Sequence, residues 1–323
     1  MNKADGRAER AADAGYALAW NVVRRVPEPI ARAAFAALAD LAWLRRGRGV
    51  RQLEANLRRV LGSDVQPRRL RAVSRAAMRS YLRYWVEVFR LPVWSAERVL
   101  THFRLDGEEV LLGELARGRG VVAVLPHTGN WDLAGAWIVH RGVPFTTVAE
   151  RLRPQALFDR FVAYREALGM EVLPLTGGAV PPTGVLARRL LEGGLVCLVG
   201  DRDVTASGVQ VEFFGEPARM PGGPAVLATR TGAMLLPVTV HYAGRMTVGQ
   251  VHPPVEPPPG VDHREQVAVM TQAVARCFEA AIAAHPQDWH MLQRVWTADI
   301  QSRPAPAASA ADAAALAGAA GGG

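Results

Sequence analysis

The stretch Val121-Val-Ala-Val-Leu-Pro126 runs directly into His127-Thr-Gly-Asn-Trp-Asp132, and the two segments together predict the centre of the fold. The first is a short apolar run rich in β-branched residues, which predicts a buried strand. Gly129 allows a tight turn next, and a helical pattern of apolar residues follows over residues 131–141. The sequence therefore predicts a strand, a turn and a helix, with His127 at the carboxyl end of the strand.

The same alternation continues toward the C-terminus. We expect a loop over residues 201–220, strands over residues 144–150, 171–175, 195–200, 234–242 and 246–251, and helices over residues 154–168, 183–192, 223–231 and 262–284. Alternation at this spacing favours an α/β fold with a central mixed, largely parallel sheet flanked by helices. Antiparallel strands can stand at the edges of such a sheet.

The first hundred residues show helical periodicity, with helices expected over residues 8–26, 29–44, 49–61 and 67–91. Trp and Tyr residues alternate there with arginines, a combination typical of the lipid–water boundary. We therefore expect residues 1–100 to form a helical membrane-facing region; the alternative is an ordinary helical subdomain whose aromatic side chains face the core. This region should form one continuous domain with an α/β core over residues 101–300. Residues 301–323 are mostly Ala and Gly and are expected to be a disordered tail.

Composition excludes several kinds of chemistry. Lys3 is the only lysine, so the chain has no phosphate-binding Gly-x-x-x-x-Gly-Lys loop and no suitable lysine for a pyridoxal cofactor. It also has no Gly-x-Ser-x-Gly and no His-Glu-x-x-His motif. Cys197 and Cys277 are isolated, so they form neither a disulfide framework nor a metal cluster in our expectation. Two isolated cysteines favour a reducing compartment. We expect no metal and no resident cofactor.

The net charge of +8 favours anionic partners such as phospholipid head groups or CoA phosphates. Nucleic acid is not expected, because no nucleic-acid-binding module accompanies the arginines. The N-terminus does not resemble a cleaved signal, and no window approaches the roughly 20 uncharged residues of a membrane-spanning helix. We therefore expect the protein in the cytoplasm or on a membrane face.

Acidic residues at two places can serve His127. Asp132 lies five residues further on, in the first turn of the predicted helix, and Asp201-Arg202-Asp203 follows the predicted strand over residues 195–200. Strand ends of a parallel sheet share one edge, and a carboxylate beside an imidazole stabilises the imidazolium that forms when the ring takes a proton. A structural histidine and an exposed turn with local ion pairs are the alternatives. The spacing by itself indicates a suspected acid–base site.

A resemblance extends this interpretation. His127-Thr-Gly-Asn-Trp-Asp132 resembles the His-x4-Asp/Glu signature of glycerolipid acyltransferases, in the longer form of the lipid A late acyltransferases. Further blocks are closer to one branch, the phosphatidylinositol mannoside acyltransferases of actinobacteria. These blocks are Asp201-Arg202-Asp203, Ser207-Gly208-Val209, Phe213-Phe214-Gly215-Glu216, Ala218-Arg219-Met220-Pro221, Gly223-Pro224-Ala225 and the ending Trp289-His290-Met-Leu-Gln-Arg294-Val-Trp296. The resemblance covers about residues 10–300.

The resemblance implies an acyl-CoA-dependent acyltransferase that lies peripherally on the cytoplasmic face of the plasma membrane. It would move a palmitoyl-type chain from acyl-CoA, as co-substrate, to the 6-hydroxyl of a mannose on a phosphatidylinositol mannoside. His127 would deprotonate that hydroxyl, and no acyl-enzyme would form. Its partners would be acyl-CoA, a mannosylated inositol phospholipid and an anionic membrane surface, with no obligate protein partner.

The resemblance also implies roles for individual residues. The family position of Asp201 pairs with the histidine and is commonly Glu, which is one methylene longer than Asp. The residues expected in catalysis are His127, Asp201 and Asp132, and those expected to bind substrate are Glu150, Arg165, Arg202, Phe213 and Phe214. Phe213-Phe214 and Leu133-Ala-Gly-Ala-Trp137 would line a groove for the acyl chain, with core packing as the alternative. Arg165 or Arg202 would stabilise a phosphate or an oxyanion.

Three other functions remain open at this point. One is an acyltransferase for another glycolipid, such as a lipid A precursor. The second is a thioester hydrolase, which would deliver water in place of a sugar hydroxyl. The third is a lipid-binding protein without catalysis, although the presence of His127, Asp132 and Asp201 together argues against it.

Overall fold

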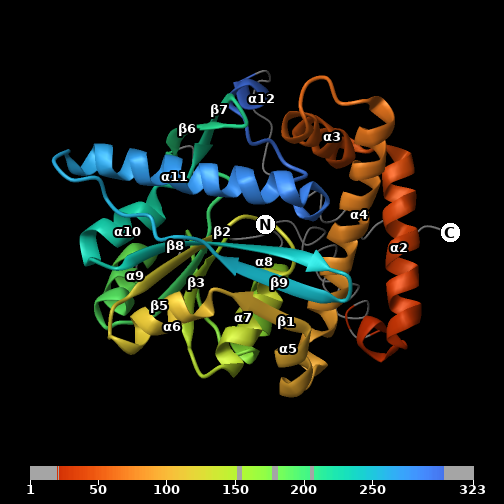
Figure 1. The fold of residues 1–323 in the computed structure, drawn as a ribbon. Coiled ribbons are helices and arrows are strands. Elements are labelled where there is room, and N and C mark those ends of the chain that lie inside the picture. The colour runs from red at the N-terminus through yellow and green to blue at the C-terminus, as the bar shows by residue number, and fades with distance from the viewer. Residues whose placement is uncertain (1–19, 21, 151–154, 177–180, 204–206, 302–323) are drawn as a thin grey trace, which may run out of the picture.

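A seven-stranded sheet forms the middle of the molecule in a computed structural model that describes residues 20, 22–150, 155–176, 181–203 and 207–301 (Figure 1). The strand order is β1-β9-β8-β2-β5-β3-β4. The strands are β1 (Phe103–Asp106), β2 (Val121–Leu125), β3 (Phe145–Ala149), β4 (Glu171–Pro174), β5 (Leu195–Val199), β8 (Met234–Ala243) and β9 (Met246–Val251). All neighbours pair in parallel except β8 and β9, so the predicted mixed, largely parallel sheet is confirmed.

Helices cover both faces of this sheet. They are α5 (Ala96–His102), α6 (Glu108–Ala116), α7 (Trp131–His140), α8 (Gln155–Ala167), α9 (Pro182–Leu191), α10 (Gly223–Thr231) and α11 (His263–Ala284). Alternate residues of β2 enter two separate cores, because successive strand side chains point to opposite faces. Val121 and Ala123 pack with α5, α6 and α7, whereas Val122 and Val124 pack with α9, α10 and α11. Figure 1 shows α11 above the sheet and α6 and α7 below it.

The N-terminal helices pack beside the sheet around a third core. They are α2 (Glu28–Arg45), α3 (Arg48–Leu61) and α4 (Pro67–Arg90), followed by a short 3₁₀ turn, η1 (Leu91–Val93). The aromatic side chains described between Trp20 and Trp94 are all buried or half-buried. They therefore face the interior, as the alternative interpretation expected, and a membrane-facing role for this region stays a prediction. Most of the helix expected over residues 8–26, and all but Gln301 of the tail expected over residues 301–323, lie outside the described residues.

The loop expected over residues 201–220 was wrong in part. A separate antiparallel hairpin, β6 (Val209–Phe213) with β7 (Glu216–Met220), stands there and packs on α11. Its turn holds Phe214 and Gly215 at φ 50° and 74°. Such turns favour Asn or Asp before Gly, so a Phe at the first position concealed the hairpin in the sequence. Strand β1 and helices α5 and α6 are further elements that the sequence pattern did not reveal.

Helix α11 is, by length and composition alone, long and apolar enough to cross a membrane, and among the described residues it is the one helix that is. It lies across the sheet (Figure 1), with Met270, Val274 and Phe278 buried in the core it shares with β2. A core helix passes the same test of length and composition. The chain ends in the described region with η2 (Pro286–Asp288) and α12 (Thr297–Gln301).

The turn after β2 yields a stability prediction. Gly129 has φ 57°, and a Cβ there would lie 2.8–2.9 Å from Val240, including its backbone. Gly118 also has a positive φ, 73°, but open space around it. Gly118→Ala should cost only the left-handed backbone strain of about 1–2 kcal/mol. Gly129→Ala must in addition displace β8, so we expect its melting temperature in thermal denaturation to fall further. Equal losses in the two variants would contradict this close approach.

Candidate active site

The imidazole of His127 lies at the carboxyl edge of the sheet, two residues beyond β2. Its Nδ1 is 2.5 Å from Asp201 Oδ1, and its backbone N–H donates to Asp201 Oδ2 at 2.9 Å. The His127 side chain is 31% exposed, whereas Asp201 is fully buried. With Nδ1 held by the carboxylate, Nε2 is the ring nitrogen left to meet a substrate, which is the geometry of a general base.

The pairing of two strands produces this contact. β2 and β5 are parallel neighbours, and Val121 pairs with Leu195 in a register that continues to Leu125 and Val199. His127 and Asp201 are separated by the same 74 residues. Gly200 N–H donates to Leu125 O at 2.8 Å, which carries the pairing past the end of β5. The expectation that these two strand ends meet at one edge is therefore confirmed.

Three hydrogen bonds satisfy the buried carboxylate of Asp201. The third donor, besides the two groups of His127, is Trp289 Nε1, at 2.9 Å from Oδ2. Burial by itself would raise the pKa of Asp201, but the charge of His127 and these hydrogen bonds outweigh it and lower that pKa below its ordinary value. Asp201 therefore stays ionised and can stabilise a positive charge on the imidazole.

Asp132 has other partners. It lies in the first turn of α7, which Asn130 caps by accepting a hydrogen bond from Leu133 N–H at 2.9 Å. Its carboxylate binds Arg165 Nε at 2.7 Å and accepts the Tyr84 hydroxyl at 2.7 Å. Burial opposes the charge of Arg165, but Asp132 more than compensates and raises the pKa of that guanidinium. Of the two carboxylates considered for His127, the structure thus places Asp201, and not Asp132, against the ring.

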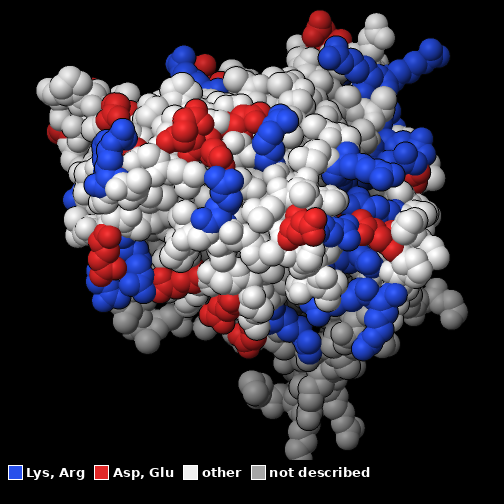
Figure 2. All heavy atoms as spheres, turned by 60° about the horizontal axis from the view of Figure 1, so that its bottom comes forward, with Lys and Arg blue, Asp and Glu red and all other residues white. Residues whose placement is uncertain are grey.

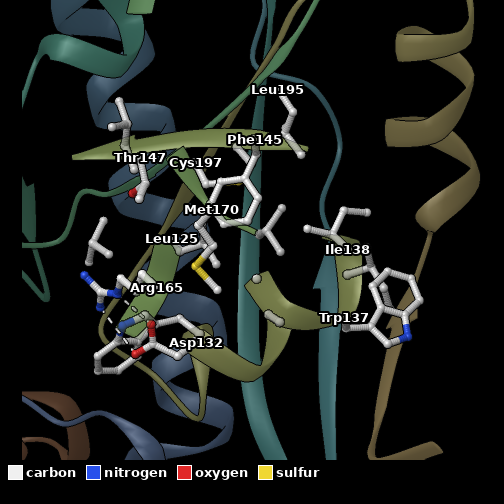
Figure 3. A pocket seen from close by; sticks show the side chains of 18 of the residues that line it. Leu125, Asp132, Trp137, Ile138, Phe145, Thr147, Arg165, Met170, Leu195 and Cys197 are labelled. Atoms are coloured by element: carbon white, nitrogen blue, oxygen red, sulfur yellow. Dashed lines mark hydrogen bonds and ion pairs between the residues drawn. The ribbon is translucent and has the colours of Figure 1, made fainter. Parts of the chain in front are cut away.

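An apolar pocket lies between α7 and the sheet, and Asp132 and Arg165 are part of its lining. Its empty volume is about 750 Å³, a figure that includes space open to solvent, and most of the lining side chains are apolar. Figure 3 shows Asp132 and Arg165 together at one end of the view, with Phe145, Met170 and Ile138 further along. Trp131 also lines the pocket, and its ring meets the His127 ring edge-on at 5.5 Å. The His127 ring is therefore in contact with Trp131, a residue of the pocket lining.

The remaining predicted residues fall in two groups. Ala134, Gly135 and Trp137 line the pocket, as expected of residues 133–137. Phe213 and Phe214 do not: Phe213 is fully buried in the core on the other face of the sheet, and Phe214 packs against that core. For these two, the core-packing alternative describes the structure.

Glu150 and Arg202 are brought together at the same edge of the sheet. They form an ion pair of 3.1 Å that is partly open to solvent, with side chains 53% and 24% exposed. Arg202 directly follows Asp201, and Glu150 follows β3, the other neighbour of β5. The pair thus lies at the same edge of the sheet as the His127–Asp201 pair, and Arg202 supplies a cation there.

Two residues of the site are not predicted from the sequence. In the sequence, Trp289 is one residue of the aromatic and basic ending, and Tyr84 is one of several aromatic residues in the N-terminal helices. Each contacts a site carboxylate through a polar atom on its ring. A buried Trp or Tyr tends to find a partner for that atom, but the partner lies 88 and 48 residues away and no local pattern points to it.

Comparison with known proteins supplies the class. The model of the family described as bacterial lipid A biosynthesis acyltransferase matches residues 8–298, so the chain belongs to this family and is an acyltransferase. Among curated relatives, the phosphatidylinositol mannoside acyltransferase of Mycolicibacterium smegmatis is 48% identical over 291 residues, 89% of this chain and 92% of that protein. The protein of the same name from Mycobacterium tuberculosis is 48% identical over 293 residues, 90% of each chain.

The contrast between two buried tyrosines tests the geometry around Asp132. Tyr84→Phe removes the hydroxyl that donates to Asp132, and the exposed fraction of Tyr84 is only 3%. We expect a loss of about 1–3 kcal/mol in the free energy of unfolding. The control is Tyr164→Phe: this hydroxyl is equally buried and has no hydrogen-bond partner among the described residues. Its removal should be neutral or stabilising in urea unfolding, and a loss as large as that of Tyr84→Phe would refute the assignment.

Proposed function

We propose that this acyltransferase moves a long-chain, palmitoyl-type acyl group from acyl-CoA to the 6-hydroxyl of a mannose on a phosphatidylinositol mannoside. The observation that carries the proposal is His127, with Nδ1 held by the buried Asp201 and its ring against Trp131 of the apolar pocket. The names of the two 48%-identical relatives support this choice of acceptor. The apolar lining of the pocket supports an apolar chain as the group transferred.

The reaction follows from these positions. His127 Nε2 takes the proton of the mannose hydroxyl, and the oxygen attacks the thioester carbonyl carbon. The new C–O bond forms and the C–S bond breaks, and the departing CoA sulfur takes the proton from the imidazolium. Asp201 stabilises that imidazolium through Nδ1. Stabilisation of the negative charge of the carbonyl oxygen or of a CoA phosphate is assigned to Arg165 in the pocket lining or to Arg202 beside Asp201.

A direct transfer, without an acyl-enzyme, agrees with the chemistry of the pocket. The only thiol in its lining is Cys197, and burial raises the pKa of this thiol to about 12. Because the thiolate is the nucleophilic form, Cys197 is a poor nucleophile near neutral pH. The sequence contains no Gly-x-Ser-x-Gly motif that would supply a serine instead.

A membrane surface is part of the proposal, on the cytoplasmic face of the plasma membrane. Leu41 and Leu44 on α2 are 40% and 63% exposed, and Arg45 and Arg48 next to them are exposed. Figure 2 shows many cationic side chains on the side of the molecule where α2 and α4 lie, with acidic ones among them. Exposed leucines beside arginines suit the boundary between acyl chains and anionic head groups.

The catalytic proposal is tested by His127→Ala. We expect turnover of palmitoyl-CoA with a mannosylated inositol lipid to fall by about 10² to 10⁴, because a general base is lost. His140→Ala, which removes an exposed imidazole at the end of α7, is the control and should leave turnover unchanged. Acyl transfer is measured by lipid mass spectrometry, and release of free palmitate with no lipid product would favour a thioester hydrolase instead. His127→Ala with more than about a tenth of the wild-type turnover would refute the general-base role.

The membrane proposal is tested by removing two cations. Arg45→Gln with Arg48→Gln should weaken binding to anionic vesicles by about 2 kcal/mol, roughly 30-fold, in liposome flotation. Arg264→Gln with Arg276→Gln removes the same charge from exposed positions on α11 and should have a smaller effect. Equal effects of the two double variants, or binding insensitive to salt and lipid charge, would argue against this surface.

A further inference from the structure

Three consecutive residues near the C-terminus hold the loop that carries His127. Asp288 O accepts the Gly129 N–H at 3.0 Å, and His290 N–H donates to His127 O at 2.8 Å. Between them Trp289 forms a β-bridge with Thr128 and donates its indole N–H to Asp201 Oδ2. The segment 288–290 thus contacts both members of the His127–Asp201 pair, through main chain and side chain.

This segment is itself fixed by buried contacts. Asp288 accepts hydrogen bonds from Ser80 Oγ at 2.7 Å and from Tyr242 N–H at 2.8 Å. Trp289 is fully buried in the core that it shares with Phe213 and Trp296. A donor whose ring is held on all sides cannot follow a moving carboxylate. Together with the His127 backbone N–H, which donates to the same oxygen, it fixes where Asp201 Oδ2 lies, and with it the direction in which Oδ1 faces His127.

We propose that Trp289 is a positioning residue for catalysis, whose indole N–H orients the Asp201 carboxylate and limits how strongly it holds the proton on His127. This inference rests on the proposed function, because it presumes that His127 is the general base. Trp289 does not line the pocket, so its indole N–H acts through Asp201 and not by contact with substrate.

The indole N–H affects both the orientation of the Asp201 carboxylate and the ability of His127 to act as a base. With the N–H in place, part of the negative charge on Asp201 is satisfied by a neutral donor. Without it, the carboxylate rotates more freely and attracts the imidazolium more strongly. Protonated His127 cannot act as a base, so the acid limb of the pH profile of kcat/KM should move to higher pH.

Other ionisable groups near the pair do not replace this effect. On the same segment, burial lowers the pKa of His290 to about 3, so that ring is neutral, and burial raises the pKa of Asp288. On α7 and α8, Asp132 and Arg165 neutralise each other as an ion pair. None of these contacts changes when the Trp289 ring loses its N–H.

Trp289→Phe is the test, and Trp296→Phe is its matched control. Both tryptophans are fully buried in one core, and each indole donates one hydrogen bond, at 2.9 Å to Asp201 and at 2.8 Å to Phe213 O. Steady-state kinetics are measured from pH 5 to pH 9 with palmitoyl-CoA and the mannosylated lipid, with melting temperatures alongside. Trp289→Phe should lower kcat about 10- to 100-fold with KM little changed. It should move the acid limb up by about half to one pH unit.

Melting temperatures are measured at each pH and the profiles are compared only where all variants are folded, so that acid unfolding does not imitate the expected shift. Trp296→Phe should keep the wild-type limb even if it lowers the melting temperature as much. The inference is overturned if the acid limb of kcat/KM lies at the same pH in wild type, Trp289→Phe and Trp296→Phe. It is also overturned if the limb moves by the same amount in both variants. His127→Ala is assayed in parallel: if it stays active, the proposed function itself is wrong, whereas an inactive His127→Ala with an unshifted Trp289→Phe overturns only the role of Trp289.

Discussion

The buried carboxylate of Asp201 is the constraint on which the site depends. A carboxylate taken out of water is costly unless donors surround it, and three donors meet this one: the backbone and ring of His127 and the indole of Trp289. These donors come from the end of β2 and from the segment after η2. To satisfy one charge, the chain must bring three distant segments together, and the same contacts leave one nitrogen of His127 directed at substrate.

The fold supplies those segments in a simple way. Parallel pairing of β2 with β5 places His127 beside Asp201 through a register that is already set six residues earlier, at Val121 and Leu195. Helix α4 donates hydrogen bonds to two further carboxylates around the site: the Ser80 hydroxyl to Asp288, and the Tyr84 hydroxyl to Asp132. The apolar pocket lies against α7, so the helix that follows His127 also lines the space proposed for the acyl chain.

Much of this was predictable from the sequence, and the rest was not for physical reasons. The strand ending at His127 and the one ending before Asp201 were visible as apolar runs followed by polar residues, and parallel strand ends meet. Asp132 is near His127 in sequence, but its place in the first turn of α7 directs it to Arg165. Trp289 escaped because a contact across 88 residues leaves no periodic pattern. Phe213 and Phe214 belong to one of the family blocks, yet a hairpin that the sequence pattern does not reveal carries Phe213 into the opposite core and Phe214 against it.

One comparison of turnover tests most directly whether Asp201 is the carboxylate that serves His127. Asp201→Asn, Asp201→Glu and Asp132→Asn are measured at saturating acyl-CoA and acceptor, with folding checked by circular dichroism. Asp201→Asn keeps the size but loses the charge that stabilises the imidazolium, so kcat should fall by about 10² or more, and Asp201→Glu should retain far more activity. Asp132→Asn should lower stability through Arg165 and Tyr84 more than it lowers kcat. Near-normal turnover in Asp201→Asn, with Asp132→Asn folded but inactive, would contradict the pairing of His127 with Asp201 as the source of catalysis.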